Sequence, residues 1–312
     1  MRVFLRTKHG LGDNCQFRIV VAHYRHLYPD AYIRVESNPN TYCFYSDLVN
    51  EWSAYKYPFE TGGWDIAHYI HFGHLERGLP NLPNTKATWE LHHQGLTPNP
   101  ELYQYHCNTT ALHDDKALNW LIENNQAERG MVAVHYQGNS SPDKKDLQNY
   151  EAYSLCDWLK GEGFQPWLID YGTSTLVDYP CPTELLNEPE ESVANLVALI
   201  AQSRFMVAIN SGPACFAACT NTPTFVLNRG FHPATTFDPA PNLIHLLTES
   251  TDDLLPEAGR EDCLDYFDEN YNAIYTDNIL DEVRGCITEC FAEPYDEELG
   301  LRLLKEFGGI CM

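Results

Sequence analysis

FMVAINSGPA, residues 205–214, is the stretch that decides the fold. Residues 205–209 are apolar and short, as expected of a buried strand, and Ser211 and Gly212 follow in a loop. Pro213 stands just before an expected helix that starts at Ala214, where the missing N–H group costs nothing. A buried strand that runs through a short loop into a helix is typical of parallel α/β sheets.

The same order of strand, loop and helix recurs along the chain, and it predicts a βαβ unit at the start and a doubly wound parallel sheet in the second half. Strands are expected at 3–5, 31–35, near 64–72, and at 131–136, 165–170, 205–209 and 224–227. Helices are expected at 17–28, 147–161 and 192–203, and from Ala214 onward. A charged and polar stretch, 122–130, separates the two units, so we expect domains at 1–127 and 128–250. Residues 251–312, with 17 Asp+Glu against 4 Lys+Arg, are expected to form an acidic helical tail that packs on the two domains.

Composition and charge exclude several classes of function. The formal net charge is −24, which repels phosphate backbones and anionic membrane surfaces, so a nucleic-acid partner is unlikely. Residues 1–6 lack the apolar region of a signal peptide, and the apolar stretch 193–201 is too short to span a bilayer. Eleven cysteines, an odd number, favour free thiols and a cytoplasmic location. A homo-oligomer is compatible with all of this.

Three loops follow the carboxyl ends of expected strands, where ligands bind in open parallel sheets. In the loop 210–213, Ser211-Gly212 lets backbone approach a ligand, and the free N–H groups at the next helix start suit a diphosphate; the alternative is an ordinary connection. The loop 137–145 supplies amide and hydroxyl donors, Ser140 among them, and the ammonium groups of Lys144 and Lys145.

The first loop, 8–13, places Asp13 directly after Gly10, Leu11 and Gly12. A carboxylate there could accept a proton from an attacking hydroxyl. The competing interpretation is that Asp13 caps the following helix, and both roles are compatible.

Together these loops resemble glycosyltransferase family 9, the heptosyltransferase-like enzymes of the GT-B fold. The motifs are HGLGD at 9–13, HYQGNSS at 135–141 with KKDL at 144–147, and NSGPACFAA at 210–218 with Thr-Pro at 222–223. The resemblance covers roughly residues 1–36 and 130–250. It implies two Rossmann-like domains facing a central cleft, with 1–127 on the acceptor side and 128–250 binding the nucleotide sugar. It also implies inverting sugar transfer from a nucleoside diphosphate sugar, without a metal ion or other cofactor.

The resemblance also implies roles for individual residues. Asp13 matches the general base, and the loop around it, with His9, Gly10 and Gly12, matches the acceptor side. The residues that match the family's donor-binding positions are Lys145, Ser140, Asn210, Ser211, Gly212 and Pro213. Lys144 is the second-best match to the lysine that neutralises the diphosphate. Asn210 replaces an Asp that is associated with the donor sugar, and Cys215 replaces a His, so the sugar stays unassigned.

Two other functions keep the same fold. A nucleotide-sugar epimerase or hydrolase would turn over the donor without an acceptor, and a catalytically silent protein would only bind it. No metal ligands are expected: His68, His71 and His74 do not converge at their spacing. Cys263, Cys286, Cys290 and Cys311 are expected to be packed thiols rather than a metal site.

Overall fold

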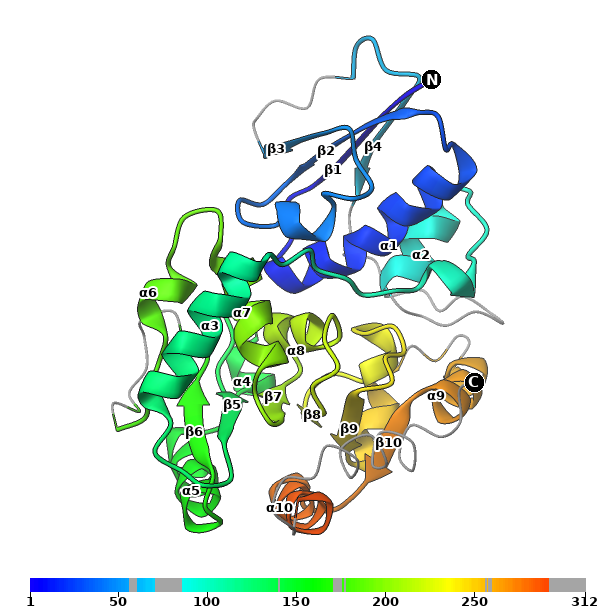
Figure 1. The fold of residues 1–312 in the computed structure, drawn as a ribbon. Helices are drawn as coiled ribbons and strands as arrows, with labels where there is room; N and C mark the ends of the chain where they lie inside the picture. Colours follow the sequence, from blue (N-terminus) through cyan, green and yellow to red (C-terminus); the bar gives the residue numbers. More distant parts are fainter. Residues whose placement is uncertain are drawn as a thin grey trace.

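The computed structural model describes residues 1–55, 61–70, 86–139, 141–170, 176, 178–255, 257 and 260–291. These residues form two parallel sheets, each with its own helices, and Figure 1 shows one sheet above the other. His71, His74, Ser140 and Cys311, which the sequence analysis singled out, lie outside the described residues.

The first sheet has four parallel strands in the order β3-β2-β1-β4. Their bounds are Arg2–Thr7 (β1), Tyr32–Ser37 (β2), Glu51–Ala54 (β3) and Ile66–Ile70 (β4). The helical segments of this part are α1 (Leu11–Leu27), η1 (Tyr42–Phe44), α2 (Lys86–His93) and η2 (Pro100–Leu102), and α3 (Ala111–Asn124) follows them in the chain. Because β2 and β4 flank β1 on opposite sides, the strand order reverses at β1, which is where such sheets bind ligands.

The second sheet has six parallel strands in the order β10-β9-β8-β7-β5-β6. Their bounds are Met131–His135 (β5), Gln165–Leu168 (β6), Met206–Ile209 (β7), Thr224–Asn228 (β8), Leu243–Leu247 (β9) and Asn272–Tyr275 (β10). Its helical segments are α4 (Pro142–Lys145), α5 (Asn149–Gly161), α6 (Thr183–Leu186), α7 (Ser192–Ala201), α8 (Gly212–Ala217), η3 (Pro233–Thr235), η4 (Glu249–Leu254), α9 (Arg260–Asn270) and α10 (Ile279–Cys290). The order reverses between β5 and β7.

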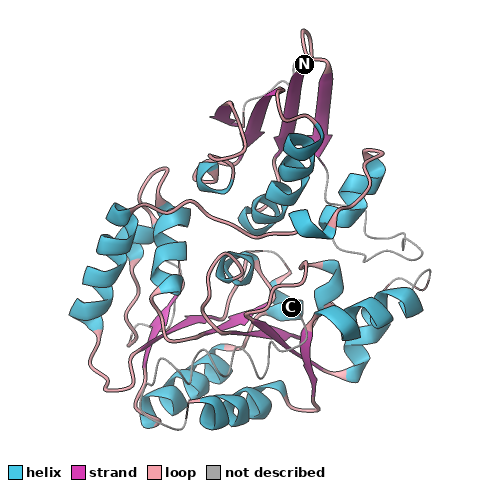
Figure 2. Ribbon diagram, turned by 45° about the vertical axis from the view of Figure 1, so that its right-hand side comes forward, coloured by secondary structure: helices cyan, strands magenta, loops and turns pink. Residues whose placement is uncertain are grey.

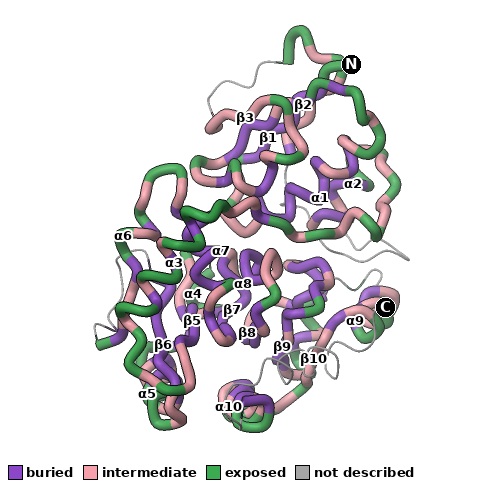
Figure 3. Tube along the Cα trace, viewed as in Figure 1, coloured by how far each residue is buried: buried purple, intermediate pink, exposed green. Residues whose placement is uncertain are grey.

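Both faces of the second sheet are covered, because successive side chains of a strand point to opposite faces. Val132 and Val134 share an apolar cluster with residues of α5 and α10. Met131 and Ala133 belong to the opposite cluster, with residues of α3, α7, α8 and α9. Figure 2 shows these two helical layers on either side of the sheet, and Figure 3 shows its central strands buried.

The sequence analysis missed several elements. It did not expect β3, β9, β10, α2 or α3, and it expected the segment after residue 250 to be helical. That segment does contain α9 and α10, but β10 between them pairs in parallel with β9 and extends the second sheet. The expectation of an all-helical tail was therefore wrong at 272–275.

The helix α3 lies before the expected domain boundary and yet packs against α7 of the second unit. Trp120 of α3 meets Trp167 of β6 edge to face, with ring centroids 5.7 Å apart. Lys116 also pairs with Glu188 at 2.7 Å. The chain therefore crosses to the second unit before residue 111, and the exact domain limits stay a prediction.

Within the described part of the chain, no helix has the length and apolar character needed to cross a bilayer. Among these same residues, no group of three or more His, Cys, Asp and Glu side chains has an arrangement that would hold a metal ion.

Candidate active site

A cavity of about 810 Å³ lies where the carboxyl ends of strands from both sheets meet. From the first unit it is lined by the start of α1 and by Lys86; from the second, by the residues that follow β5, β6, β7 and β8. Both points at which the strand order reverses therefore open into one space, as expected for a ligand held between two such sheets.

Two glycines bring the units together at this cavity. A Cβ atom on Gly12, in the first turn of α1, would lie 2.7 Å from the Cα atom of Gly212, the first residue of α8. A Cβ atom on Gly212 would lie 3.2 Å from the Gly12 nitrogen. Because real Cβ contacts are not as short as 2.7 Å, Gly12 is required for the close approach of the two helix starts, whereas a Cβ atom on Gly212 would need its neighbour to shift by a few tenths of an ångström.

Asp13 lies on the wall of the cavity, at the third position of α1. Its Oδ2 atom accepts a hydrogen bond from the Gly10 N–H at 3.1 Å, so the carboxylate does bind back to the start of its own helix. Its Oδ1 atom accepts from the Lys86 ammonium at 2.5 Å. The capping interpretation thus holds in a modified form, with Asp13 inside the helix rather than before it, and the carboxylate remains on the cavity.

Lys145 ends the short helix α4 and is 6% exposed. Burial lowers its pKa, as does the charge of Lys86, whereas Asp146 and Asp13 oppose that shift. Its side chain packs over Gly138, where a Cβ atom would lie 3.0 Å from Cε. The result is a poorly solvated ammonium on the cavity wall, which gains most when an anion approaches.

Lys144 is exposed and does not line the cavity. Its backbone packs against Gly230, where a Cβ atom would lie 2.6 Å from the Lys144 oxygen, and its ammonium lies 5.9 Å from the Phe231 ring centroid. Of the two lysines proposed for the diphosphate, the structure places Lys145 on the cavity.

Ser211 is oriented by a buried histidine. The hydroxyl of Ser211 lies 2.9 Å from Nδ1 of His135, the last residue of β5. Burial, together with the charge of Lys145, lowers the pKa of His135 to about 3, although Asp170 opposes the shift. His135 is therefore neutral near pH 7 and interacts with Ser211 as a neutral ring.

Asn210 lies between β7 and α8 and is 4% exposed. Its Nδ2 atom donates to Asn228 Oδ1 at 2.8 Å and to Thr236 Oγ1 at 2.9 Å. These hydrogen bonds between uncharged groups fix the Asn210 amide at the position where the family has an Asp carboxylate. Any contact of Asn210 with a ligand is then made without a negative charge.

Cys215 on the cavity wall and the neighbouring buried Cys15 are protonated and poorly nucleophilic. Burial raises the pKa of Cys215 to about 12, and it raises that of Cys15 well above the usual range. Cys15 from α1 and Cys219, just beyond α8, lie 3.5 Å apart at their sulfur atoms. These thiols are part of the contact between α1 and α8, where they pack as small apolar groups.

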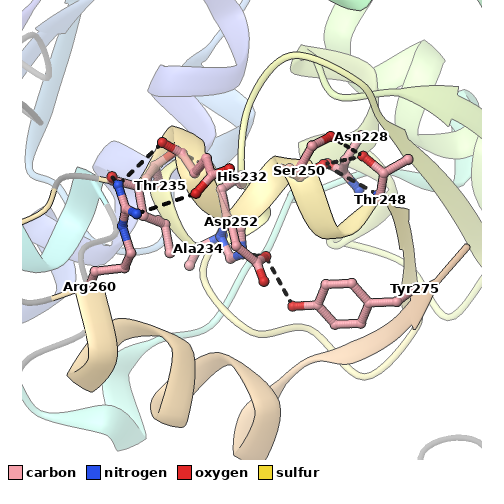
Figure 4. A network of polar contacts seen from close by, with 12 residues as sticks. Asn228, His232, Ala234, Thr235, Thr248, Ser250, Asp252, Arg260 and Tyr275 are labelled. Atoms are coloured by element: carbon pink, nitrogen blue, oxygen red, sulfur yellow. Dashed lines mark hydrogen bonds and ion pairs between the residues drawn. The ribbon is translucent and has the colours of Figure 1, made fainter. Parts of the chain in front are cut away.

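Thr235, Thr236 and Phe237 form one wall of the cavity. A network of polar contacts, shown in Figure 4, supports this wall on the side away from the cavity. His232 Nδ1 accepts from the Ala234 N–H at 3.2 Å, and its Nε2 lies 3.4 Å from Asp252. Asp252 in turn accepts from the Tyr275 hydroxyl at 3.2 Å. Strand β10, missed in the sequence, thus supports the cavity wall.

The structure brings most of the predicted site residues together. The cavity is lined by Gly10, Gly12, Asp13, Lys145, Asn210, Ser211, Gly212 and Pro213. His9 does not line it, and its backbone oxygen accepts from the side chains of Asn14 and Asn38.

Sequence reasoning assigned no role to Lys86, His135 or Asp170, which also line the cavity. His135 and Asp170 could have been found as polar residues at the ends of expected strands. Lys86 is the first residue of α2, a helix that the sequence analysis did not expect, so no local signal pointed to it.

No protein-family model matches the chain, and no curated protein is similar to it in sequence. Several solved structures do share its fold. The crystal structure of a glycosyl transferase of family 9 from Veillonella parvula has a TM-score of 0.58 at 11% identity, over 98% of this chain and 97% of its own. The E. coli ADP-heptose lipopolysaccharide heptosyltransferase II has a TM-score of 0.57 at 16% identity, over 91% of this chain and 100% of its own.

A third structure is TibC, a bacterial iron-containing dodecameric glycosyltransferase from enterotoxigenic E. coli. Its TM-score is 0.52 at 15% identity, over 78% of this chain and 62% of its own. The predicted fold class is confirmed: this chain has the two-domain α/β fold of the glycosyltransferase family 9 structures, with a cavity between the domains.

Proposed function

We propose that this chain is a glycosyltransferase that moves a sugar from a nucleoside diphosphate sugar to an acceptor hydroxyl, with inversion and without a metal ion. One observation carries the proposal: Asp13 from the first unit and Lys145 with Ser211-Gly212 from the second line the same cavity. A carboxylate on one side and cationic and amide donors on the other can serve the two ends of a displacement at a sugar carbon.

The diphosphate is proposed to lie against Lys145 and the backbone of Ser211 and Gly212. When the bond between the sugar carbon and the diphosphate oxygen breaks, its electron pair stays on that oxygen. The growing negative charge is stabilised by the buried Lys145 ammonium and by the amide donors. Because α8 has six residues, the helix dipole adds less here than these close donors do.

Asp13 is proposed to act on the acceptor. The acceptor oxygen forms the new bond to the sugar carbon while its proton passes to the Asp13 carboxylate, so the acceptor O–H bond breaks as an O–H bond forms on Asp13. Asp13 and Lys145 come from different units, so attack and departure are assigned to opposite faces of the sugar, which gives inversion.

The test begins with binding, because no acceptor needs to be known. A thermal-shift screen of nucleoside diphosphates and their sugars is expected to raise Tm for at least one base, since ligands that bind the folded state stabilise it. If no member of the panel shifts Tm or binds by calorimetry, the proposal is wrong.

The best donor then separates the remaining alternatives. Its incubation with candidate acceptors, followed by mass spectrometry, is expected to give a glycosylated product with inverted configuration, unaffected by EDTA. Release of free sugar without an acceptor would identify a hydrolase, a changed sugar would identify an epimerase, and binding without turnover of any kind would identify a silent protein.

A further inference from the structure

Both oxygen atoms of the Asp13 carboxylate accept a hydrogen bond. Oδ2 accepts from the Gly10 N–H at 3.1 Å, within the same helix. Oδ1 accepts from the Lys86 ammonium at 2.5 Å, and that bond joins α1 to α2. The first interaction orients the carboxylate, whereas the second places a positive charge against the oxygen of the proposed base.

This ion pair creates a conflict with the proposed role of Asp13. The Lys86 ammonium occupies Oδ1, an oxygen atom that would have to receive the proton of an acceptor hydroxyl. The Lys86 side chain is 21% exposed and the Asp13 side chain 20%, so water screens the ion pair only in part. Proton transfer to Oδ1 would need the ammonium to move away from that oxygen atom.

The Lys86 side chain also faces the proposed diphosphate site within the same cavity. Its charge contributes to lowering the pKa of Lys145 and offsets part of the rise in the pKa of Cys215, and all three residues line the cavity between the two units. The contact of Gly12 with Gly212 puts the first turn of α1 directly against the start of α8. The proposed diphosphate position and the Asp13 carboxylate are therefore neighbours, and one long side chain can serve either.

We propose that Lys86 is a positioning residue that pairs with Asp13 while the donor site is empty and turns to the diphosphate when the donor binds. The inference rests on the proposed function. A diphosphate carries more negative charge than one carboxylate and so competes well for the ammonium. Asp13 then keeps its bond to the Gly10 N–H and presents Oδ1 to the acceptor, so the base becomes effective only when a donor is present.

A double-mutant cycle on ligand binding tests this without any acceptor. The probe is whichever of ADP, GDP, UDP and CDP binds the unmodified protein most tightly, measured by calorimetry. Asp13→Asn breaks the competing ion pair and is expected to tighten binding about threefold or more, because Lys86 is released toward the diphosphate. In a Lys86→Met background, Asp13→Asn is expected to have a clearly smaller effect.

The alternative is that Asp13 acts on the ligand only by direct repulsion. Its removal would then tighten binding by the same factor with or without Lys86, and such additivity would overturn the proposal. Lys86→Arg keeps the positive charge and is expected to restore most of the non-additivity. Lys116→Met, which removes a lysine paired to Glu188 away from the cavity, is the matched control and is expected to leave affinity unchanged.

Turnover gives an independent readout once an acceptor is found. Lys86→Met is expected to raise the donor KM while lowering kcat less than Asp13→Asn does, and Lys86→Arg should recover the donor KM. If the unmodified protein binds none of the four nucleotides, the proposed function fails; if it binds one and the cycle is additive, only the role of Lys86 fails.

Discussion

Asp13 is half-buried and held by two donors, so its replacement tests the chemistry with little disturbance of the fold. Asp13→Asn keeps the size of the side chain and removes the basic oxygen. We expect transfer to fall by about 10²–10⁴-fold, the usual contribution of a general base, while the nucleoside diphosphate still binds. The measurement is the rate of nucleoside diphosphate release with donor and acceptor, with the exposed Asp30→Asn as control. A rate equal to that of the unmodified protein would remove Asp13 from the mechanism.

Lys145 and Lys144 are neighbours with opposite environments, and so they form a matched pair. We expect Lys145→Ala to weaken nucleoside diphosphate binding by about 1.5–3 kcal/mol, the range for a hydrogen bond to a charged group. Lys144→Ala should have little effect, because Lys144 is exposed and outside the cavity. Calorimetry that finds equal losses for both variants would place the phosphate elsewhere.

Burial lowers the pKa of Lys145, and this adds a dependence on pH. The ammonium is lost at a lower pH than that of an exposed lysine, so affinity for the nucleoside diphosphate is expected to fall earlier as the pH rises. The Lys145→Ala variant should lack this part of the pH profile.

The individual site residues show what a sequence can and cannot say. Lys145 could be preferred over Lys144 through the resemblance, and Asp13 through its place after a glycine turn at a strand end. Lys86 could not be assigned, because its partner lies 73 positions away and the pairing depends on how α2 packs against α1. Local patterns carry no information on such contacts.

The first turns of α1 and α8 approach each other at Gly12 and Gly212. This predicts that the stability of the protein is sensitive to substitution of Gly12. In Gly12→Ala the new methyl group would lie 2.7 Å from the Gly212 Cα atom, which would push the two helices apart. We expect a loss of about 1–3 kcal/mol of unfolding free energy, as for other overpacked sites, and a loss of activity from the displaced Asp13.

Gly285 provides the control for this change. It lies within α10 and has open space where its Cβ would be, so Gly285→Ala should be neutral or stabilising by about 0.5–1 kcal/mol. Urea denaturation of both variants checks the pair, and a Gly12→Ala protein as stable and active as Gly285→Ala would mean that the helices do not meet this closely.

Three buried histidines around β5, β9 and η3 predict sensitivity to acid. Burial lowers the pKa of His135 and His245 to about 3, and that of His232 to about 4, from 6.5. Between about pH 6.5 and 4 the unfolded chain binds protons that the folded chain does not, so the unfolding free energy falls as the pH falls. Each histidine contributes at most about 1.4 kcal/mol per pH unit.

Urea denaturation at pH 7.5 and 5.5 measures this slope. His245→Leu should reduce it by the share of one histidine, whatever the variant does to stability at pH 7.5. Equal slopes for the two proteins would mean that His245 titrates normally in the folded state.

Strands with a strong apolar pattern were predictable, whereas short strands in mixed surroundings were not. The expected strand at 205–209 corresponds to β7, and the one at 131–136 to β5, because buried central strands read as apolar runs. Strand β10 is four residues long, includes Asn272, and lies between two acidic helices. Its pairing with β9 is set by the rest of the sheet and leaves no periodic signal of its own.

Across both units, one apolar cluster runs from the first sheet into the second. Phe44 of the first unit and Phe216 of α8 have ring centroids 5.5 Å apart, next to the glycine contact. The sequence analysis predicted two domains that face a central cleft, but not this shared core. Any closure of the cavity has to preserve these contacts, so we expect α1 and α8 to act as its pivot.

The helix α3 shows how the two units are tied together, and it supports a regional prediction. Leu121 is 6% exposed in the cluster shared with α7, so Leu121→Ala should cost about 2–5 kcal/mol. Because α3 packs on α7, we expect faster amide hydrogen exchange in β6 and α7, with β1 and β2 nearly unchanged. Leu118→Ala on the same helix, where the side chain is 47% exposed, is the control and should change neither region. Equal acceleration in both sheets would instead show that the continuous core makes the two units one cooperative body.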